Sequence, residues 1–228
     1  MARVAILLLA LGAAVTQCRP SGMQSNELLA ALLLIPAKTY TYNVEFESTW
    51  SATTHGTGLG FPSNAHFSTL VGMTHPGGHS HWSSGAISTN GMESMAEMGR
   101  TAILQEEFNA LSGTESFRGS PIFSPGKTSF NFSTDDNRTH ITLVTMVAPS
   151  PDWFVGVSNL PLYEAGAWAS RKVVSLIVYD AGTDSGATFT AADIDTNPRV
   201  PIQPLAVDPF YVGGQYVPIG TFTFTRLN

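Results

Sequence analysis

The chain has 228 residues and carries 11 Lys and Arg against 17 Asp and Glu, which gives a formal net charge of −6. So few basic residues in an acidic chain exclude a general nucleic-acid or heparin binder, because phosphate and sulfate contacts need clustered Lys and Arg. Hydrophobic residues make up 43% of the sequence, which is enough to form a core and excludes bulk disorder. A single cysteine excludes an intrachain disulfide framework and a cysteine-based zinc cluster.

The N-terminus has the pattern of a secretory signal peptide. Arg3 supplies a short basic region, and an apolar run at 4–15 follows it, ahead of small residues that suit cleavage. We expect a signal peptide over residues 1–18 and a leader or N-terminal extension over 19–37. Two alternatives stay open. One is a short membrane anchor, although a span needs roughly 20 apolar residues, and the other is a bacterial lipoprotein modified at Cys18.

Alternating large apolar and polar residues predict a series of β-strands that begins at residue 40. Gly and Pro interrupt these runs at irregular intervals, as is typical of a sandwich whose strands are joined by long end loops. We therefore predict an all-β fold, an antiparallel β-sandwich, in one domain that spans 38–228. The expected strands are Tyr40–Phe46, Ile141–Val147, Trp153–Val157, Val173–Tyr179, which is the strongest signal, and Thr221–Thr225.

One segment departs from this period of two. Between Asn90 and Leu111, apolar residues recur at three- and four-residue spacings with glutamates between them, which predicts an amphipathic helix broken at Gly99. Its methionines could line a promiscuous binding groove. We favour the plainer interpretation, in which a short helical insertion packs against the sheet.

Two N-x-[ST] triplets agree with secretion, Asn131-Phe132-Ser133 and Asn137-Arg138-Thr139. Both lie in a polar stretch, residues 128–140, that has the composition of a surface loop. We expect N-glycosylation at Asn131 and Asn137. The alternative is a solvated hairpin that carries no sugar.

Histidines gather between residues 55 and 81, above all in the segment His75-Pro-Gly-Gly-His79-Ser-His81. Imidazoles on one loop can converge on zinc or copper. However, the Gly-Gly pair makes this loop flexible, and the sequence has no supporting cysteines and no H-E-x-x-H helix. A glycine-rich surface loop is therefore favoured over a metal site. The chain also lacks the G-x-S-x-G pentapeptide of serine hydrolases, and we expect no enzymatic activity.

Two carboxylates, Asp180 and Asp184, follow the strongest predicted strand, with Gly182 between them. A turn through that glycine can bring both carboxylates toward one point, where their oxygens suit a hard cation such as calcium. Calcium takes roughly six to eight oxygens, so a third carboxylate is the natural addition, and Asp152 lies at another strand boundary. The alternative is that Asp180 and Asp184 only form Asx-turns to their own backbone. Spacing alone does not decide between the two.

The longest motifs resemble those of one family. Residues 144–157, VTMVAPSPDWFVGV, and 179–189, YDAGTDSGATF, are similar to the two most characteristic stretches of the spondin domain, the N-terminal module of F-spondin and mindin. The resemblance covers roughly 38–228, nearly all of the expected mature chain. Shorter matches precede these two motifs in the family's order: Phe46–Trp50, Phe61-Pro62, His66–Ser68, Gly72–His75 and Met95–Gly99.

This resemblance implies a β-sandwich of C2-like character with a calcium ion at one end, held by Asp152, Asp180 and Asp184. It also implies a secreted adhesion or extracellular-matrix protein that engages an extracellular protein or glycan, such as an integrin-type receptor, through its end loops. It weakens the zinc hypothesis, because His79 and His81 have no counterpart in the family pattern. The alternative function that relatives suggest is a recognition or innate-defence factor that binds microbial carbohydrate.

Two departures limit what the resemblance implies. The sequence contains no thrombospondin type 1 repeat and no reelin-like module, which multi-module relatives carry. In addition, Tyr163 stands where some relatives have a cysteine. We therefore expect matrix or integrin-type adhesion to carry over only in part, and we expect no transmembrane segment and no nucleic-acid partner.

Overall fold

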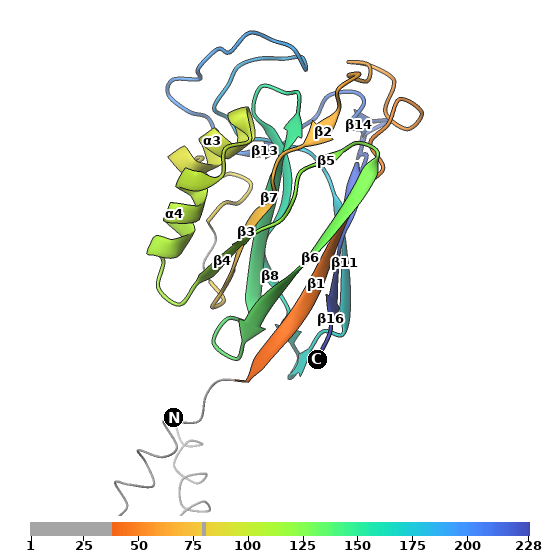
Figure 1. Ribbon diagram of the computed structural model, residues 1–228. Helices are drawn as coiled ribbons and strands as arrows, with labels where there is room; N and C mark the ends of the chain where they lie inside the picture. Colours follow the sequence, from red (N-terminus) through yellow and green to blue (C-terminus); the bar gives the residue numbers. More distant parts are fainter. Residues whose placement is uncertain (1–37, 79–80) are drawn as a thin grey trace, which may run out of the picture. The chain divides into compact units, whose positions relative to one another are not determined.

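Two antiparallel β-sheets pack face to face to form the domain (Figure 1). The computed structural model describes residues 38–78 and 81–228, so the predicted signal peptide, the extension at 19–37 and His79 lie outside the described residues. Residues Lys38–Asn228 form one compact unit. Among the described residues, no helix has the length and apolar character needed to cross a membrane.

The first sheet has four strands in the order β11-β16-β1-β6. Side chains on β1 alternate, so that Tyr42, Val44 and Phe46 are buried while Asn43 and Glu45 between them are partly exposed. Successive side chains of a strand lie on opposite faces, and the alternation therefore gives this sheet one apolar and one polar face. Its strands are β1 (Thr39–Ser48), β6 (Gly126–Asp135), β11 (Arg171–Leu176) and β16 (Gly220–Arg226).

The second sheet runs in the order β13-β12-β8-β7-β2-β5, and β3 pairs with both β7 and β4. Its central strand, β7, is buried along almost its whole length because both of its faces are covered. Two short hairpins, β9–β10 and β14–β15, extend from the loops. The bounds are β2 (His66–Phe67), β3 (Val71–His75), β4 (Glu115–Arg118), β5 (Ile122–Phe123), β7 (His140–Ala148), β8 (Trp153–Pro161), β9 (Tyr163–Glu164), β10 (Ala167–Trp168), β12 (Tyr179–Asp180), β13 (Gln203–Pro204), β14 (Tyr211–Val212) and β15 (Gln215–Tyr216).

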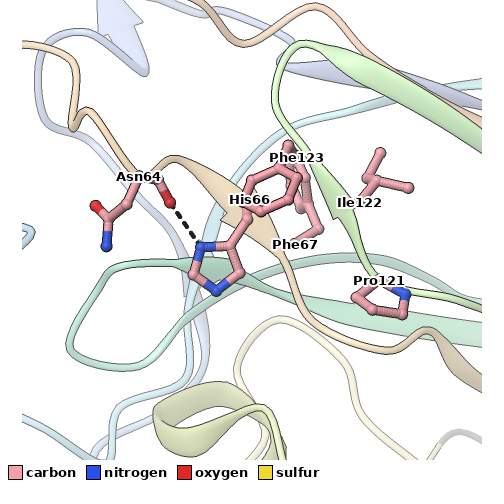
Figure 2. A pocket seen from close by; sticks show the side chains of 6 residues that line it. All are labelled: Asn64, His66, Phe67, Pro121, Ile122 and Phe123. Carbon is pink, nitrogen blue, oxygen red and sulfur yellow. Dashed lines mark hydrogen bonds between the residues drawn. The ribbon is translucent and has the colours of Figure 1, made fainter.

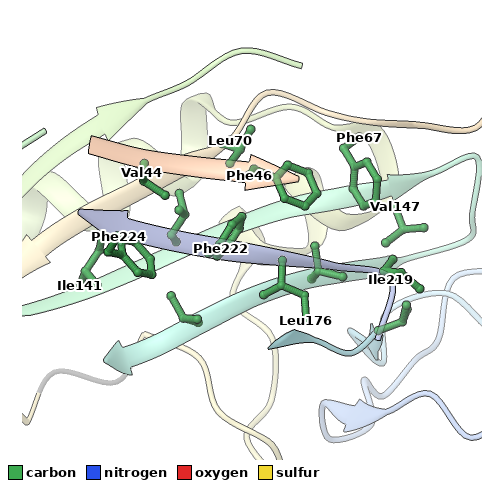
Figure 3. Packing of buried hydrophobic residues seen from close by; sticks show 14 of the residues in the cluster. Val44, Phe46, Phe67, Leu70, Ile141, Val147, Leu176, Ile219, Phe222 and Phe224 are labelled. Atoms are coloured by element: carbon green, nitrogen blue, oxygen red, sulfur yellow. The ribbon is translucent and has the colours of Figure 1, made fainter. Parts of the chain in front are cut away.

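Aromatic and aliphatic side chains fill the core between the two sheets (Figure 3). The ring of Phe46 on β1 meets that of Phe67 on β2 edge-on, with centroids 4.7 Å apart, and that of Phe222 on β16 at 5.2 Å. All three side chains are buried. Burial of one such side chain stabilises a fold by about 1.5–3 kcal/mol, so this core can hold the sandwich together without a disulfide.

Two helices, α3 (Asn90–Met98) and α4 (Ala102–Ala110), cover the face of the second sheet that points away from the first sheet (Figure 1). Thr89 caps α3 by accepting a hydrogen bond from the N–H of Met92 over 3.2 Å. Gly99 ends α3 in a left-handed conformation with φ 65°. The predicted break of the helical segment at Gly99 is therefore confirmed.

A second core lies beneath these helices. Met92 and Met95 are fully buried and belong to one cluster with Val144 of β7 and Phe154 of β8. Met92 and Met95 therefore pack against the sheet, as predicted, whereas Met98 at the end of α3 is 51% exposed. With these layers in place, the predicted all-β sandwich with a short helical insertion is confirmed.

The strongest predicted strand is two strands in the structure. β11 ends at Leu176 in the first sheet, and β12 begins at Tyr179 in the second. The carbonyl of Leu176 accepts a hydrogen bond from Ile219 and that of Val178 from Leu205, so the chain crosses between the sheets here. Both Leu176 and Val178 are buried. An apolar run looks the same in the sequence whether it stays in one strand or crosses to another.

The polar stretch at 128–140 is also different from the prediction. It is mostly strand: β6 continues to Asp135, and only residues 136–139 connect it to β7. Phe132 in this stretch is buried and stacks on Phe117, with ring centroids 5.0 Å apart. Ser129, Asn131 and Ser133, which are among the polar residues that suggested a loop, lie on the outer face of β6, an edge strand of the first sheet.

Candidate functional site

The structure brings the three predicted carboxylates to one end of the second sheet. β12 pairs antiparallel with β8, which places Asp180 opposite Trp153 and next to Asp152. The N–H of Ala181 donates to the backbone oxygen of Asp152 over 3.2 Å, and this bond anchors the loop that leads to Asp184. The strand boundaries that suggested a shared site therefore do meet.

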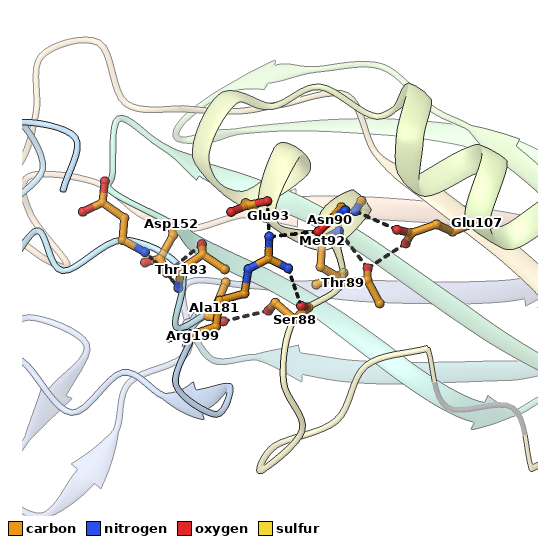
Figure 4. Close-up of polar contacts among 12 residues, drawn as sticks. Ser88, Thr89, Asn90, Met92, Glu93, Glu107, Asp152, Ala181, Thr183 and Arg199 are labelled. Atoms are coloured by element: carbon orange, nitrogen blue, oxygen red, sulfur yellow. Dashed lines mark hydrogen bonds and ion pairs between the residues drawn. The ribbon is translucent and has the colours of Figure 1, made fainter. Parts of the chain in front are cut away.

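Asp152 is completely buried. Its Oδ2 accepts hydrogen bonds from the N–H groups of Thr183 (2.7 Å) and Asp184 (3.1 Å) and from the Thr183 hydroxyl (3.2 Å) (Figure 4). Its Oδ1 is buried as well but has no hydrogen-bond partner among the described residues. Because buried polar atoms in native proteins are nearly always paired, this oxygen is an acceptor that an ordered water or a cation would satisfy.

Asp180 and Asp184 each stabilise a turn. Asp180 Oδ1 accepts the N–H of Gly182 over 2.8 Å, and Asp184 Oδ1 accepts the N–H of Gly186 over 2.6 Å. The Asx-turns of the alternative interpretation are therefore present. A carboxylate has more lone pairs than these bonds use, so turn formation and cation binding are compatible. Gly182 has φ 73°, and a Cβ there would lie 2.1 Å from Val200 O, so this turn requires glycine.

Burial and mutual repulsion act on these carboxyl groups. Burial raises the pKa of Asp180 to about 6, and the charge of Asp152 adds to this effect. Burial also raises the pKa of Asp152, although its hydrogen bonds from Thr183 and Asp184 act in the opposite direction. Within residues 38–78 and 81–228, none of the three carboxylates pairs with a Lys or Arg side chain. A bound cation would relieve this accumulation of negative charge.

A fourth acid, Glu97, approaches the cluster from the last turn of α3. Burial raises the pKa of Glu97, the Thr183 hydroxyl lowers it, and neighbouring carboxylates including Asp152 raise it further. Glu97 also lines a small pocket of about 120 Å³ with Asp184 and Asp193. In the sequence, Glu97 looks like the other glutamates on the polar face of the helix. No local pattern shows that this turn of the helix meets the loop after β12.

The donor chemistry fits a hard cation, because carboxylate oxygens, backbone carbonyls and water are the ligands that calcium prefers. As residues 38–78 and 81–228 are arranged here, however, no three His, Cys, Asp or Glu side chains are grouped closely enough to hold a metal ion. Cation binding would require Asp180 and Asp184 to turn carboxylate oxygens toward Asp152 Oδ1. Calcium at these residues stays a prediction.

Three of the histidines that the structure describes, His66, His75 and His81, form hydrogen bonds with different partners. His75 is buried, and its ring bonds to a threonine of β7, whereas His66 bonds to a backbone oxygen two residues earlier. His81 Nε2 lies 2.8 Å from Glu107 Oε2, and the same carboxylate accepts the N–H of Gly91 over 2.8 Å at the start of α3. His81 therefore belongs to a network that fixes the two helices.

An apolar depression of about 340 Å³ lies at the same end of β7 as the carboxylates (Figure 2). β2 pairs with the last two residues of β7, Val147 and Ala148, directly before the loop that carries Asp152. Phe123 is 78% exposed, and its ring centroid is 6.4 Å from that of His66. An exposed aromatic ring beside an apolar hollow is typical of binding surfaces. The depression is lined by Asn64, His66, Phe67, Pro121, Ile122 and Phe123.

The two predicted glycosylation sites lie on different kinds of backbone. Asn131 is exposed on β6, where its Oδ1 accepts a hydrogen bond from Asn43 Nδ2 over 2.8 Å. Asn137 is exposed in the turn between β6 and β7. Both side chains are accessible, and their glycosylation stays a prediction.

Comparison with known proteins decides the family. A family model described as Spondin_N matches residues 40–211. The chain belongs to this spondin family. It is 30% identical to Spondin-2 of Rattus norvegicus over 208 residues, which cover 82% of this chain and 61% of the relative. It is 33% identical to Spondin-2 of Homo sapiens over 171 residues (69% and 50%) and 31% identical to Spondin-1 of Mus musculus over 208 residues (83% and 25%).

Membership of the spondin family confirms the resemblance and places the chain in the extracellular space. The chain spans 61% of rat Spondin-2 and only 25% of mouse Spondin-1. The activities and partners of the whole relatives therefore do not follow from membership alone. The matched segment contains the carboxylate cluster, Glu97 and both glycosylation sequons.

Proposed function

We propose that this spondin-family chain is a secreted adhesion or extracellular-matrix protein that binds calcium through Asp152, Asp180 and Asp184, with Glu97 as a further oxygen ligand. Its role is binding, and the cation is structural and not catalytic. The observation that carries the proposal is the buried Oδ1 of Asp152, an acceptor without a partner in a cluster of carboxylates.

Calcium would act by joining loops from separate parts of the chain. Asp152 precedes β8, Asp180 and Asp184 bracket the loop after β12, and Glu97 lies near the end of α3. A divalent cation with oxygen ligands from all three segments would hold a helix end and two loops in one arrangement. It would also neutralise the repulsion among these acids. Loops that are fixed in this way offer an ordered surface to a partner.

The partner surface would combine these loops with the apolar depression beside Phe123. Both lie where β7 ends at Ala148. An exposed aromatic ring next to polar loops provides the apolar centre and polar rim of a typical protein–protein interface. An integrin-type receptor or a matrix glycan is the class of partner to test first.

Thermal unfolding of the full chain with calcium and with a chelator tests the cation site. We expect calcium at about 100 times Kd to add about 2.7 kcal/mol of stability, which raises Tm by roughly 5–11 °C for a domain of this size. The double variant Asp180→Ala/Asp184→Ala should lose this response. Asp136→Asn, which changes an exposed acid before β7, should keep it. A full calcium response in the double variant would refute the assignment.

Attachment of cells and of matrix components to the immobilised protein tests adhesion separately. We expect attachment to fall when calcium is removed and when Phe123 is replaced by Ser. Val173→Ser is the matched control, because Val173 is 46% exposed on the first sheet, away from the depression. Attachment that neither treatment changes would contradict the proposed surface, and the absence of any attachment would contradict the adhesive role. Binding to microbial glycans without any attachment would favour the recognition alternative.

A further inference from the structure

The turn before β7 and the hairpin β9–β10 meet at the end of the sandwich opposite the carboxylates (Figure 1). The N–H of Leu162 donates to the backbone oxygen of Thr139 over 2.8 Å, which fixes the start of the hairpin against the end of the turn. Two segments that are separate in the sequence therefore share one surface.

Aromatic rings line a depression of about 410 Å³ between the turn and the hairpin. The ring centroid of Trp168 lies 4.3 Å from that of Tyr40 and 5.5 Å from that of Tyr163. Tyr163 is 41% exposed, whereas Trp168 is almost buried, so Tyr163 offers its ring to a ligand. Asp136 and Thr139 add polar groups to the lining. Rings with a few polar groups, in a hollow of this volume, are typical of small-molecule sites.

Asn137 lies at the edge of this depression, since Asp136 before it and Thr139 after it both line the hollow. Asp135 fixes the turn: its Oδ1 accepts the N–H of Asn137 over 2.9 Å, and its Oδ2 pairs with Arg138 at 2.8 Å. The Asn137 side chain is exposed, and no hydrogen bond among the described residues engages its amide. An ordered turn therefore presents an accessible sequon beside an aromatic surface.

We propose that Asn137 carries an N-linked glycan whose first N-acetylglucosamine units pack into this depression, against the ring of Tyr163. The apolar C–H face of a sugar suits an aromatic ring, and its hydroxyl and acetamide groups suit Asp136 and Thr139. The inference depends on secretion and does not depend on the calcium site.

The linkage needs a lipid-pyrophosphate-linked oligosaccharide, which the secretory pathway of a glycosylating cell supplies. Asn137 Nδ2 forms a bond to C1 of the first N-acetylglucosamine, and the bond from C1 to the pyrophosphate oxygen breaks. The pyrophosphate leaves with that electron pair, and one amide proton is released. Thr139 supplies the hydroxyl residue that the N-x-[ST] sequon requires.

The other sequon offers no such surface. Asn131 lies on the polar face of the first sheet, directly opposite Asn43 of β1. Its neighbours on the same face of β1 are Thr41 and Glu45, neither of which is aromatic. A glycan at Asn131 would extend into solvent, so it serves as a control within the same chain.

Mass analysis of glycopeptides from the full chain, secreted by eukaryotic cells, tests occupancy. We expect the Asn137 peptide to carry a glycan and the Asn137→Gln variant to lose it. An unmodified Asn137 in the secreted protein would overturn the proposal.

A double-mutant cycle tests the packing. In an Asn131→Gln background, we expect the Asn137 glycan to raise Tm by about 2–4 °C compared with Asn137→Gln. Tyr163→Ala should remove at least half of that gain, and Tyr163→Phe, which keeps the ring, should retain it. A glycan at Asn131, measured in an Asn137→Gln background, should show no dependence on Tyr163. An equal gain from the Asn137 glycan with and without the ring would overturn the packing.

Nuclear magnetic resonance on the unsubstituted protein keeps the test decisive if Tyr163→Ala fails to fold. We expect contacts between the acetyl methyl group of the first sugar and the ring protons of Tyr163 or Trp168. Their absence in a glycosylated sample would overturn the packing.

Discussion

β7 joins two ends of the sandwich that differ in chemistry. At the end of the sandwich where β7 ends at Ala148, the carboxylates of Asp152, Asp180 and Asp184 lie near one another. None of them has a basic partner among the described residues. At the opposite end, where β7 begins at His140, the ring of Trp168 packs against the rings of Tyr40 and Tyr163. Buried charges destabilise a fold unless they are paired or bound to a metal, whereas packed aromatic rings stabilise it.

This difference indicates what each end requires. The aromatic end is held by ring contacts, and a sugar would add to them. The acidic end keeps a buried acceptor without a partner and an Asp180 carboxyl whose pKa is raised to about 6. The stability of the acidic end should therefore depend on a bound cation, while that of the aromatic end should not.

The largest expected effect is that of Asp152→Ala. The variant leaves the buried N–H groups of Thr183 and Asp184 without their acceptor, which should lower the unfolding free energy in calcium by about 3 kcal/mol. The corresponding change at the other end, Asp136→Ala in protein that carries no glycan, should stay within about 0.5 kcal/mol, because Asp136 is exposed. Urea unfolding of both variants measures the difference, and equal losses would remove the contrast between the two ends.

A second effect is the pH dependence of the calcium-free protein. The Asp180 carboxyl has a pKa of 3.8 in the unfolded chain and about 6 in the fold. Between these values the folded chain binds more protons, so its contribution to stability rises as the pH falls from about 7 toward 4. Asp180→Asn should reduce this slope and make the calcium-free protein more stable at pH 7. A slope that is unchanged in Asp180→Asn, measured by urea unfolding at several pH values, would contradict this origin.

A smaller effect is expected for Glu97→Gln. Glu97 is only partly buried at the rim of the cluster, so its loss should weaken calcium affinity by about tenfold, or 1.4 kcal/mol, without unfolding the chain. Glu106→Gln is the matched control, because Glu106 lies on α4 and does not line this pocket. Competition with a fluorescent calcium chelator measures both affinities. Equal affinities in the two variants would remove Glu97 from the site.

Local periodicity predicted much of the fold. The alternation along β1 and the helical spacing with its break at Gly99 depend on residues that are close in sequence, and the structure confirms both. The crossing between Leu176 and Tyr179 was not predictable in the same way. Which sheet an apolar residue enters depends on partners far along the chain, Ile219 and Leu205.

As with the fold, local sequence patterns predicted only some of the residues of the candidate site. Asp180 and Asp184 were found from a strand end and a glycine turn, and Asp152 from another strand boundary. Glu97 was missed because its part in the site comes from the packing of α3 against β7, which no local spacing encodes. Three acids of the cluster could therefore be predicted from local motifs, whereas the fourth, Glu97, could be found only from the way the helices pack on the sheet.

Calorimetric titration of calcium into the chelator-treated full chain tests the cation site most directly. We predict saturable binding of one calcium ion per chain, strongly weakened in Asp180→Asn and unchanged in Asp136→Asn. No binding heat in the unsubstituted protein at several temperatures, or the same affinity in Asp180→Asn, would contradict the account.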